Sequence, residues 1–265
     1  GQVIASGHDF YSSPCLSPEG FRLAWLQWDH PNMPWDGCEL WVGELTPDGW
    51  LGRLQHVAGG PGESIFQPRW SPDGILHFVS DRNGWWNLYR WRNGQVEPLL
   101  EMEAEFGVPQ WALGMSTYAF ESAERIVCAY SQRGTWRLGV LHIREQRLYP
   151  VDTQYTQIMH VQAGAGRAVF VAGSPKEPLS VVQLHLDSGR TDVLRRSHDQ
   201  AVHSAYVSLP DAIEFPTSHG RTAYGFFYRP RNRDYAAPVR ERPPLLVKSL
   251  GGPTSATSTA LDMVI

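Results

Sequence analysis

A glycine-rich stretch near the end of the chain is the part of the sequence whose residue types could take part in acyl-transfer chemistry. Residues 249–256 contain Gly251, Gly252 and Pro253, and they follow the apolar segment 244–248, which predicts a buried strand. Glycines in this position allow a backbone N–H to approach a substrate closely and to stabilise a developing oxyanion. Taken alone, Gly-Gly-Pro is better explained as an ordinary turn. Gly251 and Gly252 are therefore candidate oxyanion-loop residues that need support from the rest of the chain.

The nucleophile that such a loop would serve is not present in the sequence. A serine nucleophile on a sharp strand-to-helix turn has the form G-x-S-x-G, and no five consecutive residues match it. The chain begins with Gly1 and Gln2 rather than Met, and it ends on the strand-like Met263, Val264 and Ile265. We expect both ends to be cut, so that the chain is a piece of a longer protein. By itself it should not cleave peptides or esters.

A Pro-rich loop over residues 29–37 contains or borders a second group of candidates, Trp35, Asp36 and Glu39. A loop carboxylate can pair with the free amine of a peptide, and an exposed aromatic ring can contact a substrate side chain. The alternative is that Asp36 and Gly37 form a turn and that Glu39 is a solvated strand end. We predict Trp35, Asp36 and Glu39 as substrate-binding residues, with that alternative left open.

The remaining reactive side chains lack the spacing of a metal or cofactor site. An odd number of cysteines without metal-type spacing indicates core thiols in a reducing cytoplasm. The histidines have no partner at ligand spacing, and the glycines of residues 59–62 lack the Lys and Ser or Thr of a phosphate loop, which favours a connection between structural units. We predict no metal and no cofactor. The cysteines and histidines considered are Cys15, Cys38, Cys128, His8, His30, His198 and His203.

Composition excludes several partners. A net charge of −4 and a pI near 6.2 give no electrostatic reason to bind phosphate backbones or anionic lipid, so we expect neither nucleic acid nor membrane as a partner. No run of 18 apolar residues and no charged-then-apolar leader is present, which also favours a cytoplasmic protein.

An internal repeat indicates how these candidates are positioned. Residues 14–20 recur at 68–74, each ending in Ser-Pro-acid-Gly, and the step from Pro18 to Pro72 gives a period of 54 residues (72 − 18). Each copy predicts a turn that opens a new strand, at 21–27 and at 75–80. Third strands follow at 39–42 and 87–91, where the step from Leu40 to Leu88 is only 48 residues (88 − 40). The first unit therefore carries six extra residues (54 − 48), and they fall in the loop 29–37.

Weaker copies extend the array. Strands at 111–120, 125–130 and 135–143 make a third unit, and strands within 159–172 and 179–186 make a fourth. Repeats of this length with aromatic strands and glycine turns predict an all-β protein with a partial β-propeller of about four blades over residues 1–208. Because an open array leaves unpaired strand edges, we expect homo-oligomers formed through exposed blade edges.

The pattern changes at residue 209. A hairpin over 213–228, a basic and polar connection over 229–242 and the apolar segment 244–248 follow in order. We assign residues 209–265 to the first strands of a second, truncated domain.

Three stretches together resemble bacterial members of the prolyl oligopeptidase family, with the dipeptidyl- and acylaminoacyl-peptidase branch the most similar. They are residues 59–74, the hairpin end at 227–230 and the segment 244–256, and the resemblance runs in order over essentially the whole chain. It implies a β-propeller capping an α/β-hydrolase domain, a Ser-Asp-His triad, and peptide substrates admitted between the two. It also implies that Gly251 and Gly252 belong to the oxyanion loop.

The sequence departs from the family at two points. No triad position matches any residue of this chain, and Leu250 stands where the family usually has His before Gly-Gly-Pro. We therefore predict part of a serine exopeptidase for short peptides, of dipeptidyl- or acylaminoacyl-peptidase type, in which the propeller gates access. The alternative is a non-catalytic β-propeller that binds a protein or a small ligand.

Overall fold

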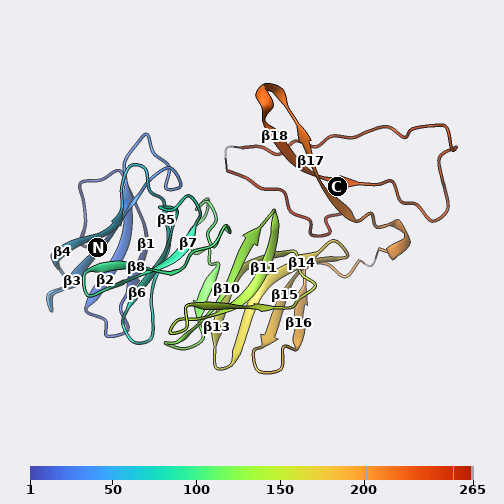
Figure 1. Cartoon of the computed structure of the whole chain (residues 1–265). Helices are drawn as coiled ribbons and strands as arrows, with labels where there is room; N and C mark the ends of the chain where they lie inside the picture. Colours follow the sequence, from blue (N-terminus) through green and yellow to red (C-terminus); the bar gives the residue numbers. More distant parts are fainter. Residues whose placement is uncertain (201, 253, 264–265) are drawn as a thin grey trace.

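The regular structure consists of four four-stranded antiparallel sheets and one separate hairpin (Figure 1). The computed structural model describes residues 1–200, 202–252 and 254–263. The sheets are called blades 1 to 4 in chain order. Their strands are β1 Phe10–Leu16, β2 Arg22–Trp28, β3 Glu39–Leu45 and β4 Leu51–Gly59; β5 Ile65–Trp70, β6 Leu76–Ser80, β7 Asn87–Arg92 and β8 Gln95–Leu100; β9 Tyr118–Phe120, β10 Arg125–Gln132, β11 Thr135–His142 and β12 Arg147–Val151; β13 Gln157–Gly164, β14 Arg167–Ser174, β15 Glu177–His185 and β16 Thr191–Arg196.

The four sheets are consecutive blades of a partial β-propeller, as the repeat predicted. Within every blade each strand pairs only with its neighbour in the chain, and successive blades lie side by side in chain order (Figure 1). Beyond blade 4, η1 Ser204–Tyr206 leads to the hairpin of β17 Pro210–Pro216 and β18 Thr222–Tyr228, with η2 Ser218–Gly220 at its turn. The assignment of residues 209–265 to a hydrolase domain stays a prediction.

The repeated Ser-Pro-acid-Gly segments form the turns that the sequence predicted. Gly20 and Gly74 adopt φ values of 81° and 79°, a region that glycine enters without steric cost. The N–H of each glycine donates to the carbonyl of Ser17 or Ser71 at 2.9 Å and closes the turn. These two turns therefore set the start of β2 and β6.

Alternation along the strands divides the hydrophobic core into three layers, one between each pair of adjacent blades. In β6, Phe78 packs toward blade 1 whereas Val79 packs toward blade 3, and both are completely buried. In β10, Ile126 faces blade 2 and Val127 faces blade 4. Since successive strand residues point to opposite faces, a fully apolar run buries both faces of a middle blade. Each such side chain contributes about 1.5–3 kcal/mol by burial.

A polar clamp joins the innermost strands of blades 2 and 3. Gln67 lies at a bulge in β5 with φ 51° and is buried. Its side chain donates to Tyr118 O at 2.7 Å and accepts from Thr117 N at 2.7 Å, while the Tyr118 hydroxyl donates to Gln67 O at 2.8 Å. Ser13, 54 residues earlier (67 − 13), has φ 52° at the equivalent bulge of β1. The 54-residue repeat therefore includes the bulge in the first strand of each blade as well as the Ser-Pro-acid-Gly turn that follows it.

Two sequence predictions about strands are wrong. Residues 244–248 form no strand, and Leu245, Leu246 and Val247 are 75%, 91% and 75% exposed. An apolar strand of this kind is stable only between neighbours that accept its hydrogen bonds, and none of the described residues pairs with it. In the third unit only 118–120 of the predicted strand 111–120 belongs to a sheet, and residues 111–114 are exposed and pair with no strand among the described residues.

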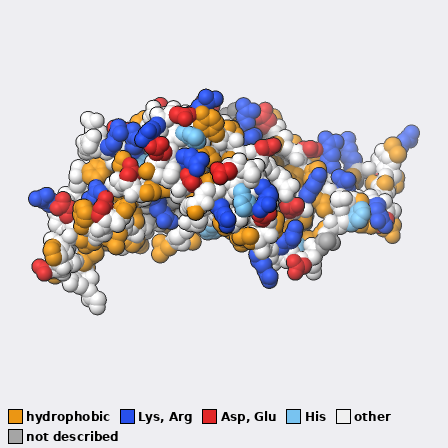
Figure 2. Space-filling view, turned by 90° about the horizontal axis from the view of Figure 1, so that it is seen from below, with side chains coloured by type: hydrophobic (Ala, Val, Ile, Leu, Met, Phe, Trp, Pro, Cys, Tyr) orange, Lys and Arg blue, Asp and Glu red, His pale blue; other side chains and the backbone are white. Residues whose placement is uncertain are grey.

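Acidic and basic side chains are mixed on the surface. Figure 2 shows acidic and basic side chains interspersed over one face, with hydrophobic side chains at the left end, where blade 1 lies. Ion pairs such as Arg90 with Glu97 (2.7 Å) and Arg125 with Glu121 (2.8 Å) account for part of this mixture. In the part of the chain that the structure describes, no helix has the length and apolar character needed to cross a membrane.

We predict that Gln67→Ala lowers the free energy of unfolding by about 2–3 kcal/mol, because Thr117 N–H and Tyr118 O would be left buried without partners. Urea denaturation followed by tryptophan fluorescence measures the change. Gln55→Ala on the exposed part of β4 is the matched control and should change little. Equal effects of the two substitutions would contradict the role given to the clamp.

Acid should destabilise the blades through His77. This β6 residue is 1% exposed, its Nδ1 lies 3.0 Å from Ile75 O, and its ring meets Phe120 edge-on. Burial lowers the pKa of His77 from 6.5 to about 4. The unfolded chain therefore takes up a proton at higher pH than the folded chain does, and stability is lost as pH falls from 6.5 toward 4. The loss amounts to about 3 kcal/mol in total.

Unfolding free energies measured between pH 7 and pH 4 test this expectation. His77→Gln should flatten the pH dependence in this range, whereas Gln55→Ala, at an exposed position without a titratable side chain, should leave it unchanged. A pH dependence that persists unaltered in the His77 variant would refute the assignment.

Candidate substrate-facing site

All the candidate residues of the loop 29–37 lie on one end of the propeller, which we call the connection face. A four-stranded antiparallel blade begins and ends on the same face, and its second and third strands are also joined there. The connection face therefore carries the loop between β2 and β3, the segments 107–117 and 152–156 between blades, and the turn at 175–176. The Ser-Pro-acid-Gly turns lie on the opposite face.

The loop 29–37 is fixed at its base by two aspartates. Asp29 accepts from Asp9 N at 2.8 Å and lies 2.8 Å from His8 Nδ1, while Asp9 accepts from His30 N at 3.0 Å. The Asp9 backbone N–H, followed by the His8 side chain, lowers the pKa of Asp29. These contacts tie the start of the loop to the residues that enter β1.

Asp36 closes a turn within the loop, as the alternative interpretation proposed. Its Oδ2 accepts from Met33 N at 2.9 Å, and its own N–H donates to Met33 O at 2.9 Å. The side chain remains exposed at the connection face. A turn role and contact with a substrate amine are both compatible with this position, so substrate binding by Asp36 stays a prediction.

The Glu39 side chain is held within blade 1 by two hydrogen bonds. Its Oε2 accepts from Trp41 Nε1 at 2.8 Å and from Gln27 Nε2 at 3.2 Å. These partners lie on the face of blade 1 that points away from blade 2, because their strand neighbours Leu26 and Leu40 belong to the core between the two blades. The structure therefore does not bring Glu39 together with Trp35.

Trp35 instead meets a residue that the sequence did not single out. Its ring lies 4.3 Å from that of Trp111, centroid to centroid, with 39° between the planes. Trp111 is 59% exposed, and its Nε1 donates to Thr254 Oγ1 at 3.0 Å. The pair thus connects the inserted loop to Thr254, two positions after Gly252 in the glycine-rich stretch. No local pattern in the sequence marks Trp111 as a partner of Trp35, because residues 111–120 were predicted as a strand of the third unit.

The two glycines of the glycine-rich stretch lie at the surface with free space beside them. Gly251 and Gly252 are exposed, and a Cβ atom added at either would meet nothing within 4 Å. Leu250 before them is 50% exposed. Pro253 lies outside the described residues. Packing against the described residues does not require glycine at these two positions, and their oxyanion role stays a prediction.

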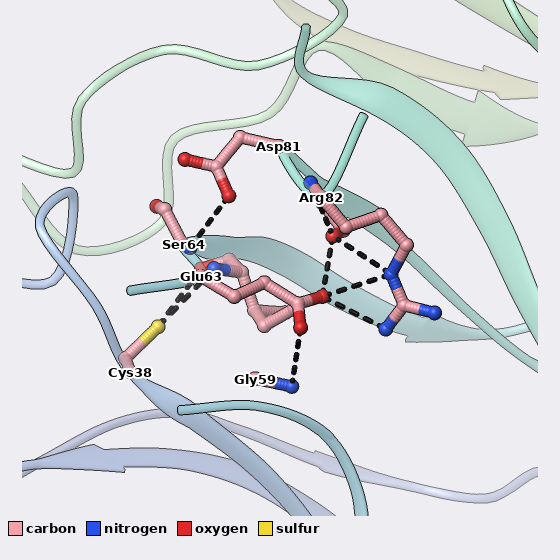
Figure 3. A network of polar contacts seen from close by, with 8 residues as sticks. Cys38, Gly59, Glu63, Ser64, Asp81 and Arg82 are labelled. Carbon is pink, nitrogen blue, oxygen red and sulfur yellow. Dashed lines mark hydrogen bonds and ion pairs between the residues drawn. The ribbon is translucent and has the colours of Figure 1, made fainter. Parts of the chain in front are cut away.

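The glycines of residues 59–62 connect blade 1 to blade 2, as predicted. Gly59 has φ 93°, and a Cβ atom there would lie 2.0 Å from Cys38 O. Its N–H donates to Glu63 Oε2 at 3.3 Å, and Glu63 Oε1 accepts from Ser80 Oγ at 2.5 Å and from Arg82 at 2.8–3.0 Å (Figure 3). One carboxylate therefore joins the end of β4 to the end of β6.

A second carboxylate lies beside this network. Asp81 Oδ1 accepts from Ser64 N at 2.7 Å, and burial, together with the nearby charge of Glu63, raises the pKa of Asp81 (Figure 3). Ser64 Oγ donates to Pro34 O at 2.9 Å, which attaches the loop 29–37 to blade 2. Burial also raises the pKa of the Cys38 thiol to about 12, so this cysteine is not a nucleophile near neutral pH.

The cysteines and histidines form no metal centre among the residues that the structure describes. No three His, Cys, Asp or Glu side chains there are close enough to hold an ion. Cys15, Cys38 and Cys128 are free thiols. His203 caps η1 by accepting from Ala205 N at 3.2 Å.

Comparison with solved structures gives close matches over most of the chain. A crystal structure of puromycin hydrolase shares 35% identity over 89% of this chain, with a TM-score of 0.83, and a puromycin-hydrolyzing peptidase of Mycobacterium tuberculosis shares 34% over 92%, with a TM-score of 0.86. Prolyl oligopeptidase B from Galerina marginata matches with a TM-score of 0.62 at 12% identity, which shows the fold alone.

The chain spans 36–38% of the length of the two puromycin-hydrolysing proteins. No family model matches the sequence. No curated protein matches it either.

Proposed function

This chain corresponds to the propeller region of the prolyl oligopeptidase family, and we propose that it gates substrate access in a cytoplasmic serine exopeptidase that hydrolyses short peptides. The observation that carries the proposal is the 34% identity over 92% of the chain, with a TM-score of 0.86, to a puromycin-hydrolyzing peptidase. Identity at that level over four blades supports a shared role for the propeller as well as a shared fold.

The connection face supplies the parts of the proposed site that this chain contains. Trp35 offers an aromatic wall, and the exposed carboxylate of Asp36 can pair with a peptide amine. Glu39 is the weaker candidate, because Gln27 and Trp41 already occupy its Oε2. Gly251 and Gly252 are proposed to offer a backbone N–H to the oxyanion of the tetrahedral intermediate.

The proposal places the nucleophilic serine, the histidine and the aspartate outside these 265 residues, so this chain alone is inactive. In such a triad serine attacks the carbonyl, histidine takes its proton and returns it to the leaving amine, and aspartate orients the histidine. The substrate class follows the relatives: two are named for puromycin hydrolysis, and the S511A mutant of one was crystallised with PGG. We propose short peptides and puromycin as substrates.

The compartment and the self-association of the chain are also proposals. Three free thiols are compatible with a reducing cytoplasm. Large apolar side chains are exposed on blade 1, and they favour association of two copies through this end of the array. They are Leu16, Phe21, Trp50 and Leu54.

Hydrolysis by the protein encoded by the whole reading frame tests the enzyme proposal. We expect turnover of puromycin and of chromogenic dipeptidyl or acyl-aminoacyl substrates, together with labelling of one serine by a phosphonate probe. The chain of 265 residues should show neither. The reading frame beyond Ile265 should supply G-x-S-x-G followed by Asp and His.

Two outcomes would overturn the proposal. A reading frame without that motif, in a whole protein that the probe does not label, would favour the non-catalytic binding propeller. Turnover by the chain of 265 residues, with one of its own serines labelled, would show that the nucleophile has been assigned to the wrong part of the protein.

Sedimentation at several concentrations tests self-association. The chain of 265 residues should shift from monomer toward dimer as its concentration rises, and a double substitution Trp50→Ser with Leu54→Ser should reduce the shift. A monomer at all concentrations would refute association through blade 1.

A further inference from the structure

Residues 254–261, which begin two positions after Gly252, lie on the connection face and are bound to it at three points. Thr254 accepts from Trp111 Nε1 at 3.0 Å, Thr259 Oγ1 lies 2.7 Å from Thr156 Oγ1, and Leu261 N donates to Ser174 O at 2.8 Å. Thr259 is buried by this contact. We call residues 254–261 the strap.

The propeller is shaped to receive the strap at its far end. Gly173, next to Ser174 in β14, lies so close to the strap that a Cβ atom there would be 2.9 Å from the Cβ of Ala260. No positive φ explains glycine at this position. The Cβ of Ala260 in the strap is the nearest of the three atoms that a Cβ atom there would meet, and Leu179 and Glu177 of β15 supply the others. The strap and blade 4 therefore approach each other closely at Gly173.

The near end of the strap depends on Trp111. Thr254 is two residues after Gly252, so the backbone of the two lies within about 7 Å. Trp111 is itself in an exposed segment, and the ring of Trp35 packs against it at 4.3 Å. Through the two indole rings, the loop 29–37 therefore helps to fix where Thr254 lies.

The glycine-rich stretch needs such an external anchor to act in catalysis. Gly251 and Gly252 are exposed, and no described atom lies within 4 Å of a Cβ atom added at either position, so close contacts do not hold either residue on that side. Glycine loses more conformational freedom on ordering than any other residue, whereas an oxyanion donor must be held within about 0.5 Å of its working position. Trp111 with Thr254 is the first anchor after these glycines that the structure records.

We propose that Trp111 is a positioning residue of the peptidase reaction, which holds the oxyanion loop in place through Thr254 and is itself held by Trp35. This inference rests on the proposed function and extends it, because it makes a propeller side chain responsible for the geometry of a loop in the other domain. Trp111 does not touch the reacting atoms; it acts through Thr254, two positions after Gly252 in the sequence.

Steady-state kinetics of the whole protein test the inference with Trp111→Phe and Thr254→Val. The first substitution keeps an aromatic ring against Trp35 but removes the N–H, and the second removes the acceptor at nearly constant shape. Loss of one hydrogen bond predicts a decrease in kcat of about 2- to 10-fold with a smaller change in KM. Because both variants remove the same bond, the double variant should be no slower than the slower single one. Trp85→Phe, at an exposed tryptophan whose indole N–H makes no hydrogen bond among the described residues, is the control and should leave kcat unchanged.

Hydrogen exchange of the same proteins separates this inference from the proposed function. Amides of residues 254–261 should exchange faster in Trp111→Phe than in the wild type, and the strands of blade 4 should not change. Unchanged exchange in the strap would overturn the anchoring role, and faster exchange with unaltered kcat would overturn the positioning role. A wild-type protein that hydrolyses none of the substrates would instead refute the proposed function, whatever the exchange shows.

Discussion

The arrangement of this protein depends on how one blade is held against the next, and the Gln67 amide shows what that requires. Burial of apolar side chains between blades supplies most of the stabilisation, but it has no direction and does not by itself fix the offset of two sheets. Gln67 fixes it, because its amide nitrogen donates to the carbonyl of Tyr118 and its amide oxygen accepts from the N–H and hydroxyl of Thr117 and the N–H of Tyr118, all in the segment that leads into blade 3. In a buried position an unsatisfied partner is costly, so the clamp selects one offset.

Similar polar contacts continue along the innermost strands. Ser116 accepts from Gln162 at 3.1 Å and exchanges hydrogen bonds with Val161, at 2.9 Å and 3.0 Å, which joins blade 3 to blade 4. Gln110 donates to Ser12 Oγ at 2.9 Å and so joins the segment before blade 3 to blade 1. Because Trp111 follows Gln110 directly, the same set of contacts that orders the blades also places the indole pair.

The sequence predicted the parts of the fold that depend on local chemistry. Ser-Pro-acid-Gly specifies a turn by itself, and the apolar inner strands between two blades are recognisable because both of their faces are buried. The outer strands β12 and β16 were not predicted, since their exposed, polar residues follow no strong pattern. The strand predicted at residues 244–248 was wrong for the opposite reason, because there the pattern was strong. An apolar composition predicts a buried strand, but it does not supply the neighbouring strands with which a buried strand must pair.

The candidate site was predictable only in part for a related reason. The six extra residues in the first unit identified the loop around Trp35, and the turn chemistry of Asp36 was visible beside Gly37. The partner of Trp35 lies 76 residues away (111 − 35), and it is brought there by the packing of three blades rather than by any local pattern. Glu39 was grouped with Trp35 by proximity in the sequence, although alternation along β3 turns it to a different face.

The close contact of two indoles has a spectroscopic consequence. Transition dipoles on rings whose centroids lie 4.3 Å apart, and whose planes are inclined by 39°, interact as a coupled chromophore. Such a pair adds a signed couplet to the circular dichroism spectrum that isolated tryptophans do not give. The protein therefore contains an intrinsic optical reporter of whether the inserted loop is docked on its neighbour, and no label has to be attached to follow that docking.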